Sequence, residues 1–129
     1  MIRTLSCHCG QVRLECNAEL VDVRECNCST CARHGFLHWK VDPRQTRLLT
    51  PRSGLSAYVW RAIYEPHLFC ATCGTPICRL SPEGYFSLNA RLIDGIDVFS
   101  LEVGRYDGMH DMPGGDMPPL VDPDASAAD

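Results

Sequence analysis

The chain has 129 residues, a formal net charge of -4, and 45% hydrophobic against 22% charged residues. This length suits one domain with its own core, and the acidic balance disfavours nucleic-acid binding, which needs a basic face. No stretch approaches the roughly 18 apolar residues of a membrane span. Residues 1–6 lead into Cys7 without the apolar region of a secretory signal. We therefore expect a cytoplasmic protein with no membrane partner.

Nine cysteines dominate the chemistry that this sequence offers. In a reducing compartment they stay free thiols, and their odd number and their clustering also argue against a disulfide framework. Thiolates are soft ligands that favour zinc, cuprous copper or iron–sulfur clusters. The composition therefore predicts a metalloprotein.

Alternating polar and apolar residues predict strands along most of the chain. Strands at 11–16 and 21–26 follow a Cys9-Gly10 turn, and the second delivers Cys26 at its end. A short helical turn is expected over 31–34, capped by Ser29-Thr30 and ended by Gly35. Further strands are expected at 36–41, 46–50, 55–60, 77–80, 85–89 and 97–103. Short strands with Gly and Pro between them predict a mainly β domain.

The composition changes from Tyr106 onward, where Gly, Pro, Asp and Met become frequent. Such a stretch buries too little apolar area to fold alone. We therefore divide the chain into a zinc domain at 1–105 and an acidic, Gly/Pro/Met-rich C-terminal tail at 106–129. The tail either wraps over the domain or stays mobile.

The densest group of thiols is Cys26, Cys28 and Cys31, called the trio below. Asn27, Ser29 and Thr30 interrupt any apolar stripe, so these sulfurs fit one metal ion better than a hydrophobic core. Three protein ligands leave one tetrahedral position open, which is typical of a zinc site that performs chemistry.

Two cysteine pairs from opposite ends of the domain form a second group, called the quartet below: Cys7, Cys9, Cys70 and Cys73. The Cys70-x-x-Cys73-Gly74 spacing is that of a zinc knuckle. The four sulfurs make a closed structural site, whose binding free energy is folding free energy. A single mixed cluster or an iron–sulfur centre stays open as an alternative, although the usual ferredoxin spacings are missing.

The remaining cysteines and the histidines have plainer interpretations. Cys16 lies on the apolar face of a strand, and Cys78 is similar, so both are interpreted as small buried hydrophobes. The histidines show no paired ligand spacing and are interpreted as surface or packed residues. His34 and His67 lie nearest in sequence to the metal groups; the others are His8, His38 and His110. The His-x-Glu or Cys-x-Glu element of a zinc deaminase is missing.

Three motifs together resemble a known family. They are Cys7-x-Cys9-Gly10-x-Val12, Cys26-x-Cys28-Ser29-x-Cys31 and His67-x-Phe69-Cys70-x-x-Cys73-Gly74-Thr75. They are similar to motifs of the glutathione-dependent formaldehyde-activating enzymes, whose domain is shared with the centromere protein V group. The resemblance covers about residues 3–105. It implies an Mss4-like (β-tent) fold, a structural zinc on the quartet and a second, looser zinc on the trio. Many members carry His where this chain has Asn27.

The ligand set restricts the chemistry of the second site. Three thiolates make zinc a weaker Lewis acid than three histidines do. The pKa of its bound water is therefore expected to lie above the ~7 of histidine sites. Exchange of that water for a soft thiol is favoured. We therefore hypothesise a carbon–sulfur lyase of the S-(hydroxymethyl)glutathione synthase type. Its substrates, glutathione and formaldehyde or another small aldehyde, are what the resemblance implies.

No catalytic residue is assigned beyond the open zinc site. Four side chains are considered as contacts for the carboxylates of the thiol, although each is interpreted as an ordinary surface residue: Arg33, His34, Arg61 and His67. Two alternatives stay open: a non-catalytic, zinc-stabilised binding module, and a thiol or zinc sensor. An enzyme needs a pocket that leads to the open position, whereas a binding module can leave it sealed.

Overall fold

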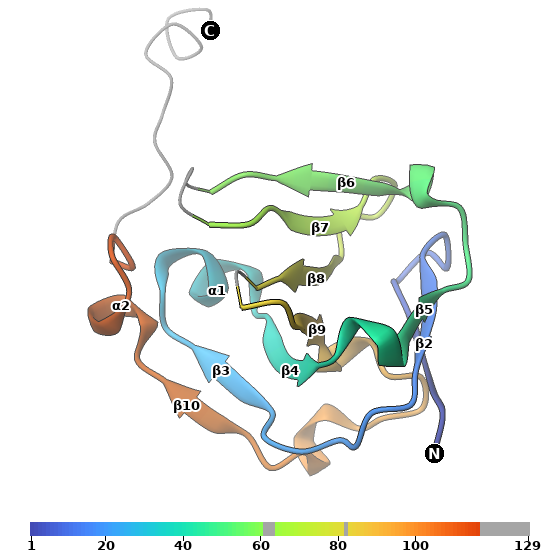
Figure 1. The fold of residues 1–129 in the computed structure, drawn as a ribbon, viewed down its shortest axis with the longest axis horizontal. Helices are drawn as coiled ribbons and strands as arrows, with labels where there is room; N and C mark the ends of the chain where they lie inside the picture. Colours follow the sequence, from blue (N-terminus) through green and yellow to red (C-terminus); the bar gives the residue numbers. More distant parts are fainter. Residues whose placement is uncertain (61–63, 82, 117–129) are drawn as a thin grey trace, which may run out of the picture.

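A computed structural model describes residues 1–60, 64–81 and 83–116 (Figure 1). Within these residues ten strands form two sheets, accompanied by two short α-helices and several 3-10 turns. The domain is therefore mainly β, which confirms the coarse fold class predicted from the sequence. None of the described helices is long and apolar enough to cross a membrane.

The smaller sheet is built on the N-terminal hairpin. Strands β1 (Arg3–Ser6) and β2 (Arg13–Cys16) pair antiparallel, and β5 (Thr46–Leu48) adds to the free edge of β2. Leu5 and Leu14 lie directly opposite each other and are both buried. An isolated bridge from Leu5 to Ile93 ties this sheet to the segment that follows strand β9 (Phe86–Asn89) of the larger sheet.

Among the described residues, the larger sheet has seven strands in the order β10-β3-β4-β9-β8-β7-β6, and only β3 and β10 run parallel. Helices α1 (Ser29–His34) and α2 (Gly108–Asp111) lie at one end of the molecule, and the smaller sheet lies at the other (Figure 1). The strands are β3 (Arg24–Cys26), β4 (Leu37–Val41), β6 (Leu55–Tyr58), β7 (His67–Cys70), β8 (Pro76–Leu80), β9 (Phe86–Asn89) and β10 (Gly104–Tyr106).

The two faces of the larger sheet differ in chemistry, because side chains alternate along each strand. On the core face, Trp39 and Leu88 are cross-strand partners and both are fully buried. The indole Nε1 of Trp39 donates to the carbonyl of Glu19 at 2.9 Å, so this buried donor is satisfied. The opposite face carries polar register partners: Arg24 with His38, Lys40 with Ser87, and Ser87 with Arg79.

The expected strand at 97–103 is wrong. The carboxylate of Asp97 accepts a hydrogen bond from the N–H of Phe99 at 3.0 Å and begins a 3-10 turn over Val98–Ser100. The apolar residues of this stretch do not share one buried face: Phe99 is 94% exposed, whereas Leu101 and Val103 pack against the core. The strand expected at 77–80 begins one residue earlier, at Pro76, and each of the other expected strands exists within shorter bounds.

The predicted cap of the first helix is also wrong. Helix α1 begins at Ser29, and its N-cap is Cys28, whose sulfur accepts from the N–H of Cys31 at 3.4 Å. The predicted end is confirmed: Gly35 adopts a left-handed φ of 64° and donates its N–H to the carbonyl of Cys31.

The segment after β10 packs on the rest of the fold as far as residue 116. Strand β10 pairs with β3, and α2 follows it directly. Further along, the carbonyl of Gly115 accepts from the N–H of Ser29 at 2.8 Å. Of the tail assigned to 106–129, residues 117–129 lie outside the described residues.

Candidate metal centres

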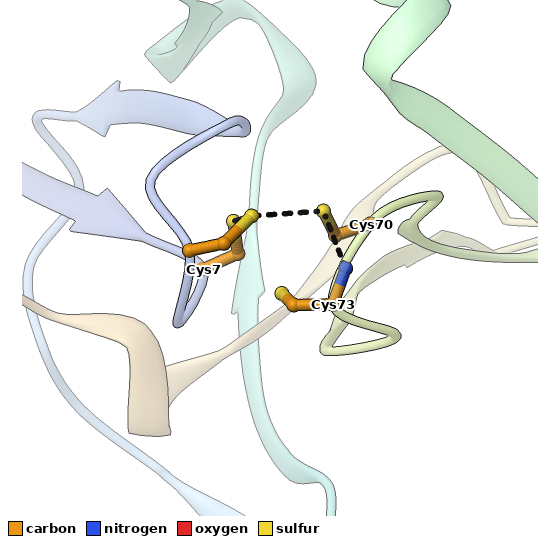
Figure 2. A group of neighbouring side chains, drawn as sticks. Cys7, Cys70 and Cys73 are labelled. Carbon is orange, nitrogen blue, oxygen red and sulfur yellow. Dashed lines mark hydrogen bonds between the residues drawn. The ribbon is translucent and has the colours of Figure 1, made fainter.

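The quartet lies where the first hairpin approaches the turn after β7, and Figure 2 shows Cys7 facing Cys70 and Cys73. All four Sγ atoms lie within 4.8 Å of one another. The distances from Cys7 to Cys9 and from Cys9 to Cys70 are both 3.7 Å. Four sulfurs held about 2.3 Å from one zinc ion stand about 3.8 Å apart at the corners of a tetrahedron. The quartet therefore fits a single zinc ion.

Two matched glycine turns position these sulfurs. Gly10 and Gly74 follow the second cysteine of each pair and adopt φ values of 82° and 76°. Their N–H groups return to the carbonyls of Cys7 at 3.2 Å and Cys70 at 2.9 Å. Because a side chain disfavours such positive φ values, glycine lets each pair of sulfurs turn toward one point.

Backbone N–H groups and a hydroxyl contact three of the quartet sulfurs, while burial and the neighbouring sulfurs raise the pKa of Cys9 to about 12. The N–H of Val12 donates to the sulfur of Cys7 at 3.3 Å, and the N–H of Cys73 donates to that of Cys70 at 3.4 Å. The Thr75 hydroxyl lies 3.1 Å from the sulfur of Cys73, and this contact contributes most to lowering the pKa of Cys73 to about 5. Thiolates are the form that binds metal.

The trio assembles where β3 passes into α1. Cys26 ends the strand, Cys28 caps the helix and Cys31 lies in its first turn. Their Sγ atoms lie within 4.8 Å of one another. The N–H of Cys28 donates to the sulfur of Cys26, and the N–H of Cys31 donates to that of Cys28, both at 3.4 Å. Cys28 and Cys31 are buried, whereas Cys26 is half-buried.

The electrostatics of the trio also fit a cation. Hydrogen bonds from Cys26 and Cys31 lower the pKa of Cys28 to about 3. The neighbouring sulfurs of Cys26 and Cys28, together with burial, raise the pKa of Cys31. One negative charge is therefore stable at this site, and three require a positive ion between them. A soft cation such as zinc satisfies that requirement.

The seven sulfurs divide into two groups that share no member, which argues against a single mixed cluster. All nine cysteines are free thiols. Cys16 and Cys78 lie in the hydrophobic core, which confirms their interpretation as small buried residues. Burial raises the pKa of Cys78 to about 11, so it stays a neutral thiol.

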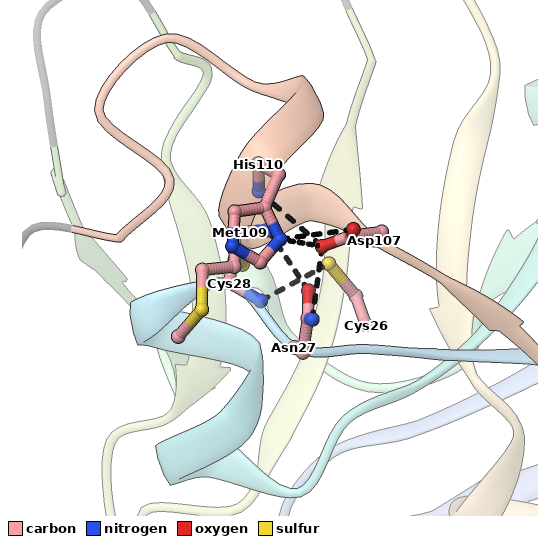
Figure 3. Close-up of polar contacts among 6 residues, drawn as sticks. All are labelled: Cys26, Asn27, Cys28, Asp107, Met109 and His110. Atoms are coloured by element: carbon pink, nitrogen blue, oxygen red, sulfur yellow. Dashed lines mark hydrogen bonds and ion pairs between the residues drawn. The ribbon is translucent and has the colours of Figure 1, made fainter.

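Residues 107–116 cover one side of the trio. Asn27 anchors the start of this segment, at Asp107 and Met109 (Figure 3). Its Nδ2 donates to Asp107 Oδ1 at 3.0 Å, and its Oδ1 accepts from the N–H of Met109 at 2.8 Å. Gly108 approaches so closely that a Cβ atom there would lie 2.5 Å from the sulfur of Cys26. Asn27 thus connects the trio to α2.

An apolar wall and a cavity both border the trio. Trp60 packs on the buried trio sulfurs and stacks on Tyr64, with ring centroids 5.0 Å apart. The Tyr64 hydroxyl donates to the carbonyl of Pro113 at 2.8 Å, which fixes the wall to the C-terminal segment. Cys26 lines a cavity of about 530 Å³ together with Tyr106. The trio is therefore shielded from one direction and bordered by open space at Cys26.

His38 is a site residue that the sequence interpretation missed. Its Nε2 lies 3.1 Å from the sulfur of Cys31, and its Nδ1 lies 2.5 Å from the Ser87 hydroxyl. Burial, and then the positive charge of Arg79, lowers the pKa of His38 to about 4, so the ring is neutral at pH 7. The alternation within 36–41 already predicts that His38 points away from the face of Trp39.

The side chains considered for thiol carboxylates have other surroundings. Arg61 lies outside the described residues. Arg33 donates to a carbonyl of its own helix at 2.8 Å, and His34 contacts a hydroxyl of that helix at 3.2 Å. His67 is buried, and its Nε2 has no hydrogen-bond partner among the described residues. Burial, and then the charge of Arg79, lowers the pKa of His67 to about 4.

The comparison with known proteins identifies a similar structure but no matching family model. No family model matches the chain. A crystal structure of a Rhodobacter sphaeroides protein is similar to it, with a TM-score of 0.72 and 26% sequence identity. The match covers 80% of this chain and 99% of that one. The likeness supports the arrangement of the strands and names no activity.

Proposed function

We propose that this protein is a zinc-dependent, lyase-like enzyme that joins a small thiol to a small aldehyde through a carbon–sulfur bond, or reverses that step. Glutathione and formaldehyde, giving S-(hydroxymethyl)glutathione, are the pair that the sequence resemblance implies. The same resemblance favours membership of the formaldehyde-activating enzymes and an Mss4-like (β-tent) fold. One observation carries the proposal: a trio of sulfurs, separate from the quartet, borders a cavity at Cys26.

The two groups of sulfurs have different roles under this proposal. The quartet joins two turns that are 61 residues apart at Cys9 and Cys70, and its four sulfurs leave no position for a substrate. The trio supplies three sulfurs, so one position is available to a ligand from solution. A zinc ion on the trio would supply a soft Lewis acid that lowers the pKa of a bound thiol.

The protein's own side chains supply the surroundings of the reaction. The wall of Trp60 and Tyr64 excludes water from one side of the trio, which strengthens electrostatic interactions there. His38, held by Ser87, orients the sulfur of Cys31. The cavity at Cys26 admits the thiol and the aldehyde together, and this proximity provides most of the acceleration.

The reaction balances without an oxidant or a reductant. The thiol sulfur forms a bond to the aldehyde carbon, and the π electron pair of the carbonyl moves to its oxygen. The proton lost by the thiol ends on that oxygen, so the product is an S-hydroxyalkyl adduct. The reverse reaction restores the thiol and the aldehyde.

Zinc analysis and an NMR assay test the proposal together. We expect two zinc ions per chain, and faster exchange between formaldehyde and its glutathione adduct than in a protein-free solution. Cys28→Ala should lose one zinc ion and the acceleration, whereas Cys78→Ala, a core control, should keep both. One zinc ion and no acceleration in the unaltered protein would favour a zinc-stabilised binding module or a sensor instead.

A further inference from the structure

A second cavity, of about 330 Å³, opens on the polar face of the larger sheet. Its lining includes three cationic side chains and one carboxylate: Arg24, Lys40, Arg79 and Asp22. The chain as a whole has a net charge of -4, so this concentration of positive charge departs from its average surface. Local positive charge in an acidic protein indicates a binding site for an anion.

The register of the sheet explains why the three cations converge. Arg24 is paired with His38, Lys40 with Ser87, and Ser87 with Arg79. Directly paired residues project from the same face of a sheet. These paired lining residues therefore come from β3, β4, β9 and β8, which are four adjacent strands fixed by their hydrogen bonds.

These cations have little internal compensation. Among the described residues, the ion pairs involve other groups, and none includes Arg24, Lys40 or Arg79. Lys40 Nζ lies 4.1 Å from the ring centroid of Tyr85, which is also part of the cavity lining. The carboxylate of Glu83 accepts a hydrogen bond from Ser81, which is the main cause of its lowered pKa. The charges of Lys40 and Arg79 add to this effect.

The guanidinium of Arg79 gives the most specific indication of a ligand. Its Nε is buried and has no hydrogen-bond acceptor among the described residues. A buried donor without an acceptor destabilises the fold. A ligand that brings an acceptor into the cavity would remove this cost. Planar guanidinium groups match carboxylates in geometry and bind them with charge-assisted hydrogen bonds.

We propose that this cavity binds the carboxylate end of a small organic anion through Arg24, Lys40 and Arg79. His38 lines the same cavity and contacts the sulfur of Cys31, so the cavity and the trio are neighbours. A molecule whose carboxylate lies between the cations has its other end near the trio. Identifying that molecule as the thiol substrate rests on the proposed function, whereas the anion site itself does not.

Glutarate, a dicarboxylate without a thiol, probes the site in the zinc-loaded full chain. In a ¹⁵N NMR titration we expect shifts of the amides that surround the cavity, and weaker binding at higher salt. Arg79→Gln and Lys40→Gln should each weaken binding at least about tenfold. Arg13→Gln removes the same charge from the smaller sheet and should leave the affinity unchanged.

Three results of this titration would overturn the anion site. They are no binding, shifts confined to another surface, and equal weakening in Arg13→Gln and Arg79→Gln. The shift map of the unaltered protein decides the matter even where a variant fails to fold. Zinc content and circular dichroism identify such a variant.

Two thiols separate this inference from the proposed function. In Co²⁺-substituted protein, a change in visible absorption reports the binding of a thiol at the trio. The two thiols are 3-mercaptopropionate, which carries a carboxylate, and 2-mercaptoethanol, which does not. We expect tighter binding of 3-mercaptopropionate, and Arg79→Gln should remove the preference. If neither thiol binds, the proposed function fails while a glutarate site stands. If both bind equally, the proposed function stands and the link between cavity and thiol fails.

Discussion

The imidazole of His38 connects the sulfur of Cys31, 3.1 Å from its Nε2, with the hydroxyl of Ser87, 2.5 Å from its Nδ1. The ring is neutral at pH 7, because burial and the charge of Arg79 lower the pKa of His38 to about 4. A thiolate only accepts hydrogen bonds, so with Cys31 ionised Nε2 carries the proton and Nδ1 accepts from Ser87. Two residues on β4 and β9 therefore orient one ligand of the trio.

Ser87→Ala tests this positioning role. Loss of the hydroxyl frees the ring to rotate or to change tautomer, so the trio should bind zinc about 10- to 100-fold more weakly. Zinc competition with a chelator measures the two sites separately, and the quartet affinity should stay unchanged. Ser56→Ala on β6 is the matched control. Equal zinc affinity of the trio in Ser87→Ala and Ser56→Ala would show that Ser87 has no part in it.

The sequence allows part of this site to be predicted. Ligands within one tight turn are local, so the spacing of Cys70 and Cys73 or of Cys28 and Cys31 is sufficient to group them. The alternation within 36–41 likewise predicts that His38 faces away from Trp39. The topology of the sheet decides which strand lies beside β4. The residues next to Ser87 and Arg79 in the sequence therefore could not assign these two side chains to the site.

The C-terminal segment shows a second limit of local patterns. Few apolar residues follow Tyr106, and composition alone therefore predicts a tail. Packing of this segment depends on close contact instead, with Gly108 against Cys26 and Asp107 bonded to Asn27. The reverse holds at 97–103, where apolar residues suggest a strand and Asp97 caps a 3-10 turn. Composition leaves open whether the segment after Tyr106 wraps over the domain, and at 97–103 capping overrides it.

Gly108→Ala should disturb the trio specifically. A Cβ atom at this position would lie 2.5 Å from the sulfur of Cys26 and 2.9 Å from that of Met112. Such overpacking costs about 1–3 kcal/mol, so we expect a lower melting temperature and weaker zinc binding at the trio. Gly104→Ala is the control, since its nearest neighbour would lie 3.6 Å away. Identical behaviour of the two variants in zinc competition would contradict the close packing of α2 on the trio.

His67 should make the fold sensitive to acid. Its pKa falls from 6.5 to about 4, chiefly through burial, so the unfolded chain binds more protons between these values. The free energy of unfolding should therefore decrease as pH falls from about 6.5 to 4, by about 3 kcal/mol from this residue. In His67→Leu the decrease should be smaller, while exposed His8→Leu should match the unaltered protein. Urea unfolding at several pH values measures it, and parallel curves for all three proteins would exclude this role.

The two groups of sulfurs should differ in what their loss does to the fold. Cys70→Ala removes a ligand from the quartet, whose binding free energy is folding free energy, so cooperative unfolding should be lost. Cys28→Ala removes a ligand from the trio and should leave a folded protein with one zinc ion fewer. Circular dichroism and zinc analysis on both variants check this. A folded Cys70→Ala protein with full zinc content would contradict a structural role for the quartet.

Cadmium NMR addresses the open character of the trio most directly. In protein loaded with ¹¹³Cd²⁺, each group of sulfurs should give its own resonance, assigned by its loss in Cys28→Ala. Addition of glutathione should shift the trio resonance and leave the quartet resonance in place. A single resonance, or a trio resonance that does not respond to the thiol, would contradict a separate site with a free coordination position.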